Sequence, residues 1–470
     1  MASEHPIAID TLPPELLAHI FSYFDGPAPS DYRLHDQPDS AMLDGSPQDV
    51  NLKNISCVSK RWRAISLPLL FRHVVWYIDR HRLLVELADL QDPSSAIPLL
   101  SYLRANNLGG RVSSFTLLLG YRTVPAQPSL DSLAVSRFDP SPLVETDEDR
   151  NWLWNALFGL IDPRRLTIIA SPQALADLLS RVTFLNDVES WSTTPPLHVL
   201  SLSRDLGSTS TPAQSSRPHY YHPPERPHPR SVLFTIRPWT HLLLNEGSFI
   251  RLYRTYEFFL RRPPSILGAL LDNKRVRGTI SLMPPTVTSF SYVAIFPHAG
   301  HFVSLIHDLP RLERLFVQLA PRNDVLQNWE EMRNVYPADL WMERDSCYHM
   351  IMEVMLHPLT SGAAAGDPVS GDHDDSDSDG HVGKARNWRF LREIETGDVA
   401  DKEAWDAAVS VLNRSQASIA PGQLAWSIER EGLLVKRPKP VIRESETPDS
   451  DSSEEDDDIL SALSAAISPW

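Results

Sequence analysis

The chain has 470 residues, of which 42% are hydrophobic, and includes 12 Trp and 16 Phe. This composition supports a sizeable core and excludes a protein that is disordered throughout. The formal charge of −16 is concentrated, because residues 361–381 hold six Asp and residues 444–458 hold nine acidic residues, with no Lys or Arg in either segment. The remainder is nearly neutral and offers no basic surface for nucleic acid.

Membrane and secretory features are missing from the sequence. No run approaches the roughly 18 apolar residues of a membrane span, and the N-terminus lacks a basic region followed by an apolar stretch. Only two cysteines occur, Cys57 and Cys347, which argues against a disulfide framework. We expect a chain without membrane contact in the cytoplasm, the nucleus or both; residues 436–439, Lys-Arg-Pro-Lys, are a short candidate for an import signal.

Two amphipathic helices are predicted near the N-terminus. The first carries one apolar stripe, formed by Leu16, Leu17, Ile20, Phe21 and Phe24. The second, over residues 55–65, presents Ile55, Val58, Trp62 and Ile65 on one face and basic residues on the other. Residues 25–51, rich in Pro, Asp, Ser and Gly, are predicted to form a surface loop. Because short helices enclose little core, they must pack on the body or on a partner.

The following segment alternates between strand-like and helix-like patterns. Strands are expected at 115–119, 166–169, 197–202, 290–296 and 315–319, and helices at 149–161, 172–181, 249–260 and 299–307. This alternation predicts an α/β body with parallel strands and crossover helices. A closed domain and a stacked solenoid both remain possible, because residues 298–320 resemble one leucine-rich repeat unit although the strand spacing is uneven.

The search for catalytic chemistry finds no phosphate loop, nucleophile elbow, His-Glu-x-x-His helix or Cys-x-x-Cys pair. His349, Glu353 and His357 have the spacing of one helix face, which is typical of a solvated face and matches no established zinc pattern. We therefore expect no catalytic residue, no metal and no cofactor.

The acidic segments contain candidate phosphorylation sites. Ser376, Ser452 and Ser453 stand beside acidic residues, as an acidophilic kinase requires, and the alternative is that these segments are solvated acidic spacers. The last residues show an apolar helical spacing over 459–467, which predicts a short amphipathic helix after the acidic run.

The N-terminal motifs resemble the F-box, a three-helix module. The resemblance rests on Leu-Pro-Pro-Glu-Leu-Leu at 12–17, Ile-Phe at 20–21, Val-Ser-Lys-Arg-Trp-Arg at 58–63 and Leu-Phe at 70–71. It implies docking on the Skp adaptor of cullin-RING ubiquitin ligases. The residues expected to contact this adaptor are Leu12, Pro13, Glu15, Leu16, Leu17, Ile20, Phe21, Val58 and Trp62.

The resemblance also implies a function and a domain organisation. The chain would be a non-catalytic substrate receptor, joined through the adaptor to a cullin and a RING subunit, with an irregular leucine-rich-repeat-like body similar to that of fungal F-box proteins. Two alternatives remain, an F-box scaffold that acts without ubiquitination and an α/β enzyme with a fortuitous N-terminus. The expected segments are an F-box at 8–75 with its loop at 25–51, body segments at 76–203, 231–360 and 384–443, loops at 204–230 and 361–383, and an acidic tail at 444–470.

Overall fold

The computed structural model describes residues 9–38, 47–79, 97–120, 151–179, 196–205, 231–255, 258, 263–271, 282–322, 325–360, 385–398 and 402–440. Ser376, Ser452, Ser453, the loop at 204–230 and the helix expected over 459–467 lie largely or wholly outside these residues. Among the described residues, no helix combines the length and apolar character needed to cross a lipid bilayer.

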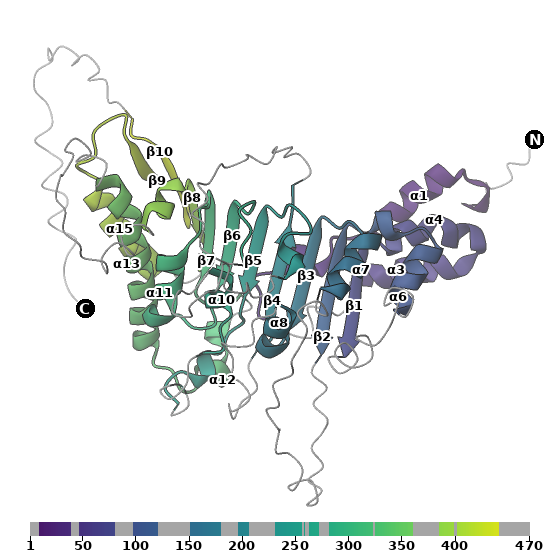
Figure 1. The fold of residues 1–470 in the computed structure, drawn as a ribbon, viewed down its shortest axis with the longest axis horizontal. Helices are drawn as coiled ribbons and strands as arrows, with labels where there is room; N and C mark the ends of the chain where they lie inside the picture. Colours follow the sequence, from purple (N-terminus) through teal and green to yellow (C-terminus); the bar gives the residue numbers. More distant parts are fainter. Residues whose placement is uncertain are drawn as a thin grey trace, which may run out of the picture.

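One ten-stranded sheet organises the body, in the order β1-β2-β3-β4-β5-β6-β7-β8-β10-β9 (Figure 1). Its strands are β1 His73–Asp79, β2 Ser114–Gly120, β3 Arg165–Ala170, β4 His198–Ser203, β5 His241–Asn245, β6 Ser289–Val293, β7 Arg314–Gln318, β8 Glu393–Thr396, β9 Leu424–Arg430 and β10 Leu433–Pro438. Strands β1 to β3 pair in parallel, as do β5 to β8. The body is therefore a mixed α/β structure whose neighbouring strands largely follow chain order.

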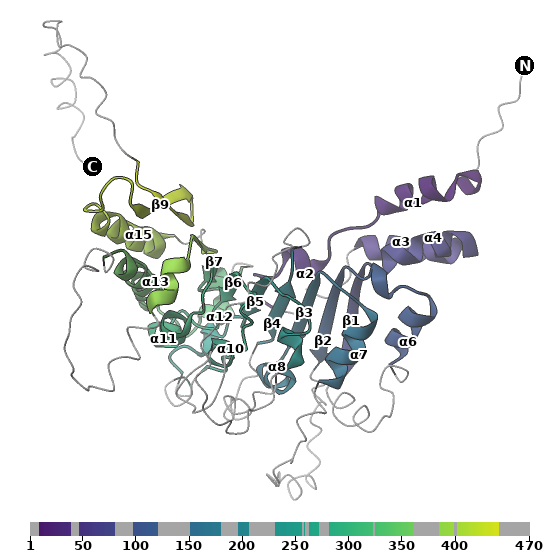
Figure 2. The same cartoon turned by 45° about the horizontal axis from the view of Figure 1, so that its top comes forward.

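Helices cover one face of this sheet (Figures 1 and 2). They are α6 Pro98–Ala105, α7 Trp152–Leu160, α8 Pro172–Leu178, α10 Leu267–Leu271, α11 Ala299–Asp308, α13 Pro337–Thr360 and α15 Glu403–Ser415, with α12 Trp329–Met332 near the start of α13. Alternate strand residues such as Phe115, Leu166 and Leu242 point into the shared apolar core. Their neighbours in sequence, including Thr116, Thr167 and Leu243, lie on the opposite face, which we call the second face.

Four helices precede the sheet: α1 Pro14–Ser22, α2 Pro29–Tyr32, α3 Pro47–Val58 and α4 Lys60–Leu70. The prediction of a single helix over residues 55–65 is wrong, because this segment contains the end of α3 and the start of α4. Ser59 separates them with extended backbone angles, φ −154° and ψ 162°, and its side chain accepts a hydrogen bond from the Trp62 N–H. A local serine cap therefore divides one apolar pattern between two helices.

Two further predictions for the body need correction. Strand β4 runs antiparallel to both β3 and β5, so the sheet is not uniformly parallel. The helix expected over residues 249–260 does not begin where it was predicted, because residues 249–255 form only the 3-10 turn Ile250–Leu252; further along, Phe258 is helical. Phe249 and Ile250 are buried in different apolar clusters, and Arg254 has a φ of 67°, which a right-handed helix does not allow.

Residues 28–38, which we call the strap, fall within the segment expected to be a surface loop. They instead lie against the second face of the sheet, where Leu34 is buried among strand residues. Figure 2 shows α2 beside β3 and β4, on the side away from α7 and α8. The expectation failed because only Leu34 in this polar stretch is a large aliphatic residue, and its burial depends on distant strands.

Candidate docking surface

The N-terminal module, residues 9–75, has its own small core. Leu17, Phe21 and Leu52 are buried at its centre. The rings of Phe21 and Trp62 pack with their centroids 5.2 Å apart. Other partly buried residues close the core around them, namely Leu12, Ile20, Ile55, Ile65, Leu69 and Leu70. The apolar stripes recognised in the sequence thus meet each other inside the module.

Hydrogen bonds from a side chain of α4 to backbone carbonyls position the start of α1 against α4. Pro14 occupies the first turn of α1, where a missing N–H costs no hydrogen bond. The Arg61 guanidinium donates hydrogen bonds to the carbonyl oxygens of Asp10 and Leu12. These contacts hold the Leu-Pro-Pro segment beside α4, so residues distant in sequence form one surface.

The residues expected to contact a partner fall into three groups. Leu17 and Phe21 are 0% and 2% exposed, so they support the surface from inside and do not form it. Leu12, Ile20 and Trp62 are half-buried, while Pro13 and Glu15 are exposed. Leu16 and Val58 are 50% and 60% exposed, which is unusual for aliphatic side chains in a packed module. The assignment of these exposed and half-buried residues as partner contacts stays a prediction.

Further exposed apolar residues lie on the same module. Tyr23 is 74% exposed, and Ile9 and Phe24 are also exposed. The Tyr23 hydroxyl lies 3.2 Å from His19 Nε2. Tyr23 lies outside the predicted apolar stripe and so was not among the expected contacts; its position beside Phe24 at the end of α1 was the available signal.

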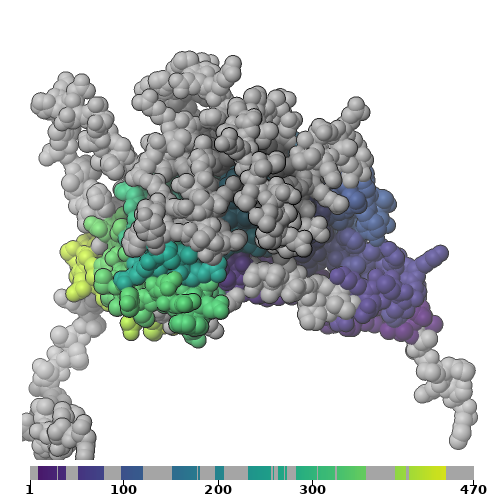
Figure 3. All heavy atoms as spheres, turned by 90° about the horizontal axis from the view of Figure 1, so that it is seen from below, coloured from purple at the N-terminus to yellow at the C-terminus, as the bar shows by residue number. Residues whose placement is uncertain are grey.

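The module joins the body through packing and one ion pair. Phe71 stacks on Tyr102 with ring centroids 5.3 Å apart, and Leu67 packs against the main core. Asp31 pairs with Arg165 of β3 at 3.1 Å, whereas the pair of Arg72 with Asp25 at 2.7 Å lies inside the module. Figure 3 places the purple module at one end of the molecule and the yellow C-terminal elements at the other. The docking surface is therefore separated from most of the body.

The body contains a buried acid–base cluster after β5. Glu246 accepts hydrogen bonds from the Tyr292 hydroxyl at 2.8 Å, the Ser265 hydroxyl at 2.8 Å and the Ile266 N–H at 2.7 Å. His301 Nε2 lies 2.6 Å from the Tyr292 hydroxyl. Burial raises the pKa of Glu246, but the nearby histidines and Ser265 outweigh it and lower the pKa below its ordinary value. The carboxylate is thus saturated by structural donors.

A second buried carboxylate follows β8. Asp398 accepts hydrogen bonds from the Leu319 N–H at 2.7 Å and from the Tyr348 hydroxyl, which also lies 2.6 Å from Thr396 Oγ1. Burial raises the pKa of Asp398, although these donors and Arg344 act in the opposite direction. The cluster joins the ends of β7 and β8 to α13, which is a structural role.

The histidines weighed for metal binding lie on α13. His349 Nδ1 lies 3.2 Å from Asp345 Oδ1, and Glu353 is exposed to solvent. Nothing is described for the side chain of His357. Within the described residues, no three His, Cys, Asp or Glu side chains converge in a group that could hold a metal ion.

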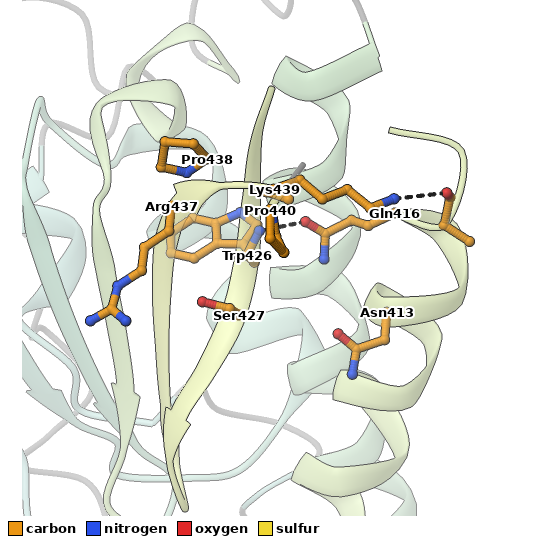
Figure 4. A pocket seen from close by; sticks show the side chains of 10 residues that line it. Asn413, Gln416, Trp426, Ser427, Arg437, Pro438, Lys439 and Pro440 are labelled. Carbon is orange, nitrogen blue, oxygen red and sulfur yellow. Dashed lines mark hydrogen bonds between the residues drawn. The ribbon is translucent and has the colours of Figure 1, made fainter. Parts of the chain in front are cut away.

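A shallow pocket of about 330 Å³ lies between α15 and the β9–β10 hairpin (Figure 4). Gln416 Oε1 accepts a hydrogen bond from the Trp426 N–H at 2.6 Å, and Lys439 donates to the Ala417 carbonyl at 3.0 Å. Arg437 pairs with Glu429 at 2.5 Å. Residues 436–439 are therefore part of a folded strand end, and the cations lining this pocket are engaged by the chain itself.

A small helical module joined to one end of a mixed α/β body gives the chain a modular organisation. Residues 9–75 match the family model described as F-box-like. The N-terminal module is therefore an F-box-like domain. No curated protein and no solved structure matches the chain.

Proposed function

We propose that this chain is the substrate-recognition subunit of a Skp–cullin–F-box ubiquitin ligase. In this proposal the F-box docks on the Skp adaptor, which connects it to a cullin and a RING subunit. The body, which we propose to be an irregular leucine-rich-repeat-like unit, holds the protein to be ubiquitinated. The cytoplasm and the nucleus are the proposed compartments.

The observation that carries the proposal is the exposed aliphatic surface of a module that matches the F-box-like family. Leu16 and Val58 are at least half exposed although both belong to motifs typical of this family. Burying such a side chain in an interface contributes about 1.5–3 kcal/mol of gross free energy. Because association itself costs at least about 4 kcal/mol, several of these contacts are needed together.

F-box domains are typically non-catalytic adaptors, which fits a role by proximity. A receptor raises the effective concentration of a substrate lysine near a ubiquitin-loaded enzyme, while other subunits perform the bond chemistry. The burial of Glu246 and Asp398 supports this division, because both carboxylates accept hydrogen bonds from structural donors of the body.

The docking step is tested by a double substitution, Leu16→Asp with Val58→Lys. Asp suits the positive N-terminal end of α1, and Lys suits the negative C-terminal end of α3, so the helices keep their stability. We expect the affinity for a purified Skp adaptor to fall at least about 10-fold, the equivalent of one lost apolar contact of about 1.4 kcal/mol. The measurement is calorimetric titration.

The matched control is Ile428→Lys, which places the same charge at an exposed aliphatic residue on β9. This control should bind the adaptor like the wild type. Equal affinity of the double variant and the wild type would exclude docking through this surface. Turnover of a bound protein that depends on the cullin then separates a receptor from a scaffold.

A further inference from the structure

The strap occupies the middle of the second face, from β3 to β7. At its start, the Asp31 carboxylate pairs with Arg165 of β3 at 3.1 Å. Further along, Asp36 forms a parallel bridge with Arg322, four residues beyond β7. The strap therefore crosses several strands, first as the short helix α2, Pro29–Tyr32, and then as a turn in which the Asp36 N–H donates to the Arg33 carbonyl at 3.1 Å.

The sheet binds the strap through its backbone. The buried Asn245 donates from Nδ2 to the carbonyl oxygens of Leu34 at 2.8 Å and Asp36 at 2.7 Å. Its own Oδ1 accepts from the Gly247 N–H at 2.9 Å, which fixes the orientation of the amide, and a φ of 66° at that glycine permits the turn. The Arg322 N–H donates to the His35 carbonyl at 2.9 Å. Contacts of this kind engage main-chain atoms and so depend little on the side chains of the bound segment.

Side-chain contacts add selectivity. Leu34 is buried between strands in a pocket of Leu118, Ile169, Leu197, Val199 and Leu243. The next residue, His35, stacks on Phe316 with ring centroids 4.3 Å apart and an interplanar angle of 25°. Burial and two arginines lower the pKa of His35 to about 4, so the stacked ring is neutral at physiological pH. The part of the second face beneath the strap, which we call the groove, thus contacts three side chains of the strap: an acidic residue, a leucine three positions later and a flat ring directly after the leucine.

The floor beneath the strap differs from the core on the other face. Thr116, Thr167 and Ser201 are buried there, and the last two hydroxyls lie 3.2 Å apart. Hydroxyl groups form hydrogen bonds with water when they become exposed. An apolar core that becomes exposed instead loses the hydrophobic free energy that stabilised it. Beside the aliphatic pocket of Leu34, this part of the floor can therefore form hydrogen bonds with water when the strap leaves.

We propose that this groove is a peptide-recognition site held closed in cis by the strap. The ligand that would replace the strap is a segment of a partner protein that can form a short helix followed by a turn, with an acidic residue three positions before a leucine and a planar ring directly after it. This inference rests on the proposed function, in which the partner is the protein that the chain delivers for ubiquitination. A tethered segment has an effective concentration on the order of millimolar, so a peptide with an intrinsic Kd of about 10 µM would bind the closed chain on the order of 100-fold more weakly.

The test uses a fluorescent peptide with the sequence of residues 28–38 and the full chain. The strap is released by Leu34→Asp with His35→Ala in the protein, and binding is followed by anisotropy. We expect the released protein to bind this peptide at least about 10-fold more tightly than the wild type. A control peptide that carries Leu34→Asp should bind neither protein. No binding to a released protein of native circular dichroism would overturn the proposal.

A second measurement decides the case if the released protein does not fold. In wild-type hydrogen exchange, the amides of Ser248 and Arg322, which donate to the strap, should exchange at least about 100-fold faster than those of β4 and β5, through a local opening. Exchange of both sets in one global event would refute an exchangeable strap. Adaptor titration on the same proteins keeps the two proposals separate, because the peptide assay contains no adaptor.

Discussion

His198 is fully buried, and neither of its ring nitrogens has a hydrogen-bond partner among the described residues. Burial lowers its pKa from 6.5 to about 4, although Glu246 acts in the opposite direction. The unfolded chain therefore binds more protons than the folded chain between pH 6.5 and about 4. The free energy of unfolding consequently falls as the pH drops through this window.

We predict a slope of about 1.4 kcal/mol per pH unit from His198 within that window, measured by urea unfolding at several pH values. His35 acts in the same window with the same sign, while Asp398, whose pKa is raised, acts in the opposite direction above pH 3.8. His198→Leu should remove the contribution of this histidine to the slope. The free energy of unfolding at pH 7 should stay the same, since the ring makes no hydrogen bond. An unchanged slope in this variant would contradict the assignment.

At the scale of elements, Ser59 separates α3 from α4. Its side chain is the only described cap for the N-terminal end of α4, and Trp62 in the module core follows three residues later. A serine cap contributes about 0.5–2 kcal/mol. The boundary between the two helices therefore depends on one hydroxyl.

We predict that Ser59→Ala destabilises the F-box by about 0.5–2 kcal/mol, because the Trp62 N–H loses its acceptor. Hydrogen exchange at the start of α4 measures the loss. Ser59→Asn should retain stability, because asparagine is an equally good cap. If both substitutions have the same effect, the hydroxyl does not act as a cap.

At the scale of the whole molecule, the F-box lies at one end and β9 and β10 at the other (Figure 3). We predict that deletion of residues 444–470 leaves the affinity for the Skp adaptor unchanged within about two-fold. The nine acidic residues in 444–458 lie outside the F-box, and salt screens exposed charges beyond about 10 Å. A large loss of affinity on truncation, in the same calorimetric titration, would contradict the modular organisation.

Much of the body follows from local pattern. The strands β2, β3, β4, β6 and β7 were predicted because each is a short apolar or β-branched run. Strand β8, Glu393–Thr396, was missed because its sequence is half charged, and its pairing partners β7 and β10 hold it in the sheet. Strand β5 was missed because His-Leu-Leu-Leu-Asn is compatible with a helix as well as a strand.

The sequence by itself determined the F-box motifs, the apolar stripe of α1 and the absence of recognised catalytic motifs, because these are local properties of spacing and composition. Only the tertiary structure decided which stripe residues remain exposed, since Leu16 and Leu17 are adjacent in sequence yet opposite in burial. It also decided the place of the strap. Leu34 and Asn245 meet 211 residues apart, and such a contact depends on the assembled sheet, which no local pattern encodes.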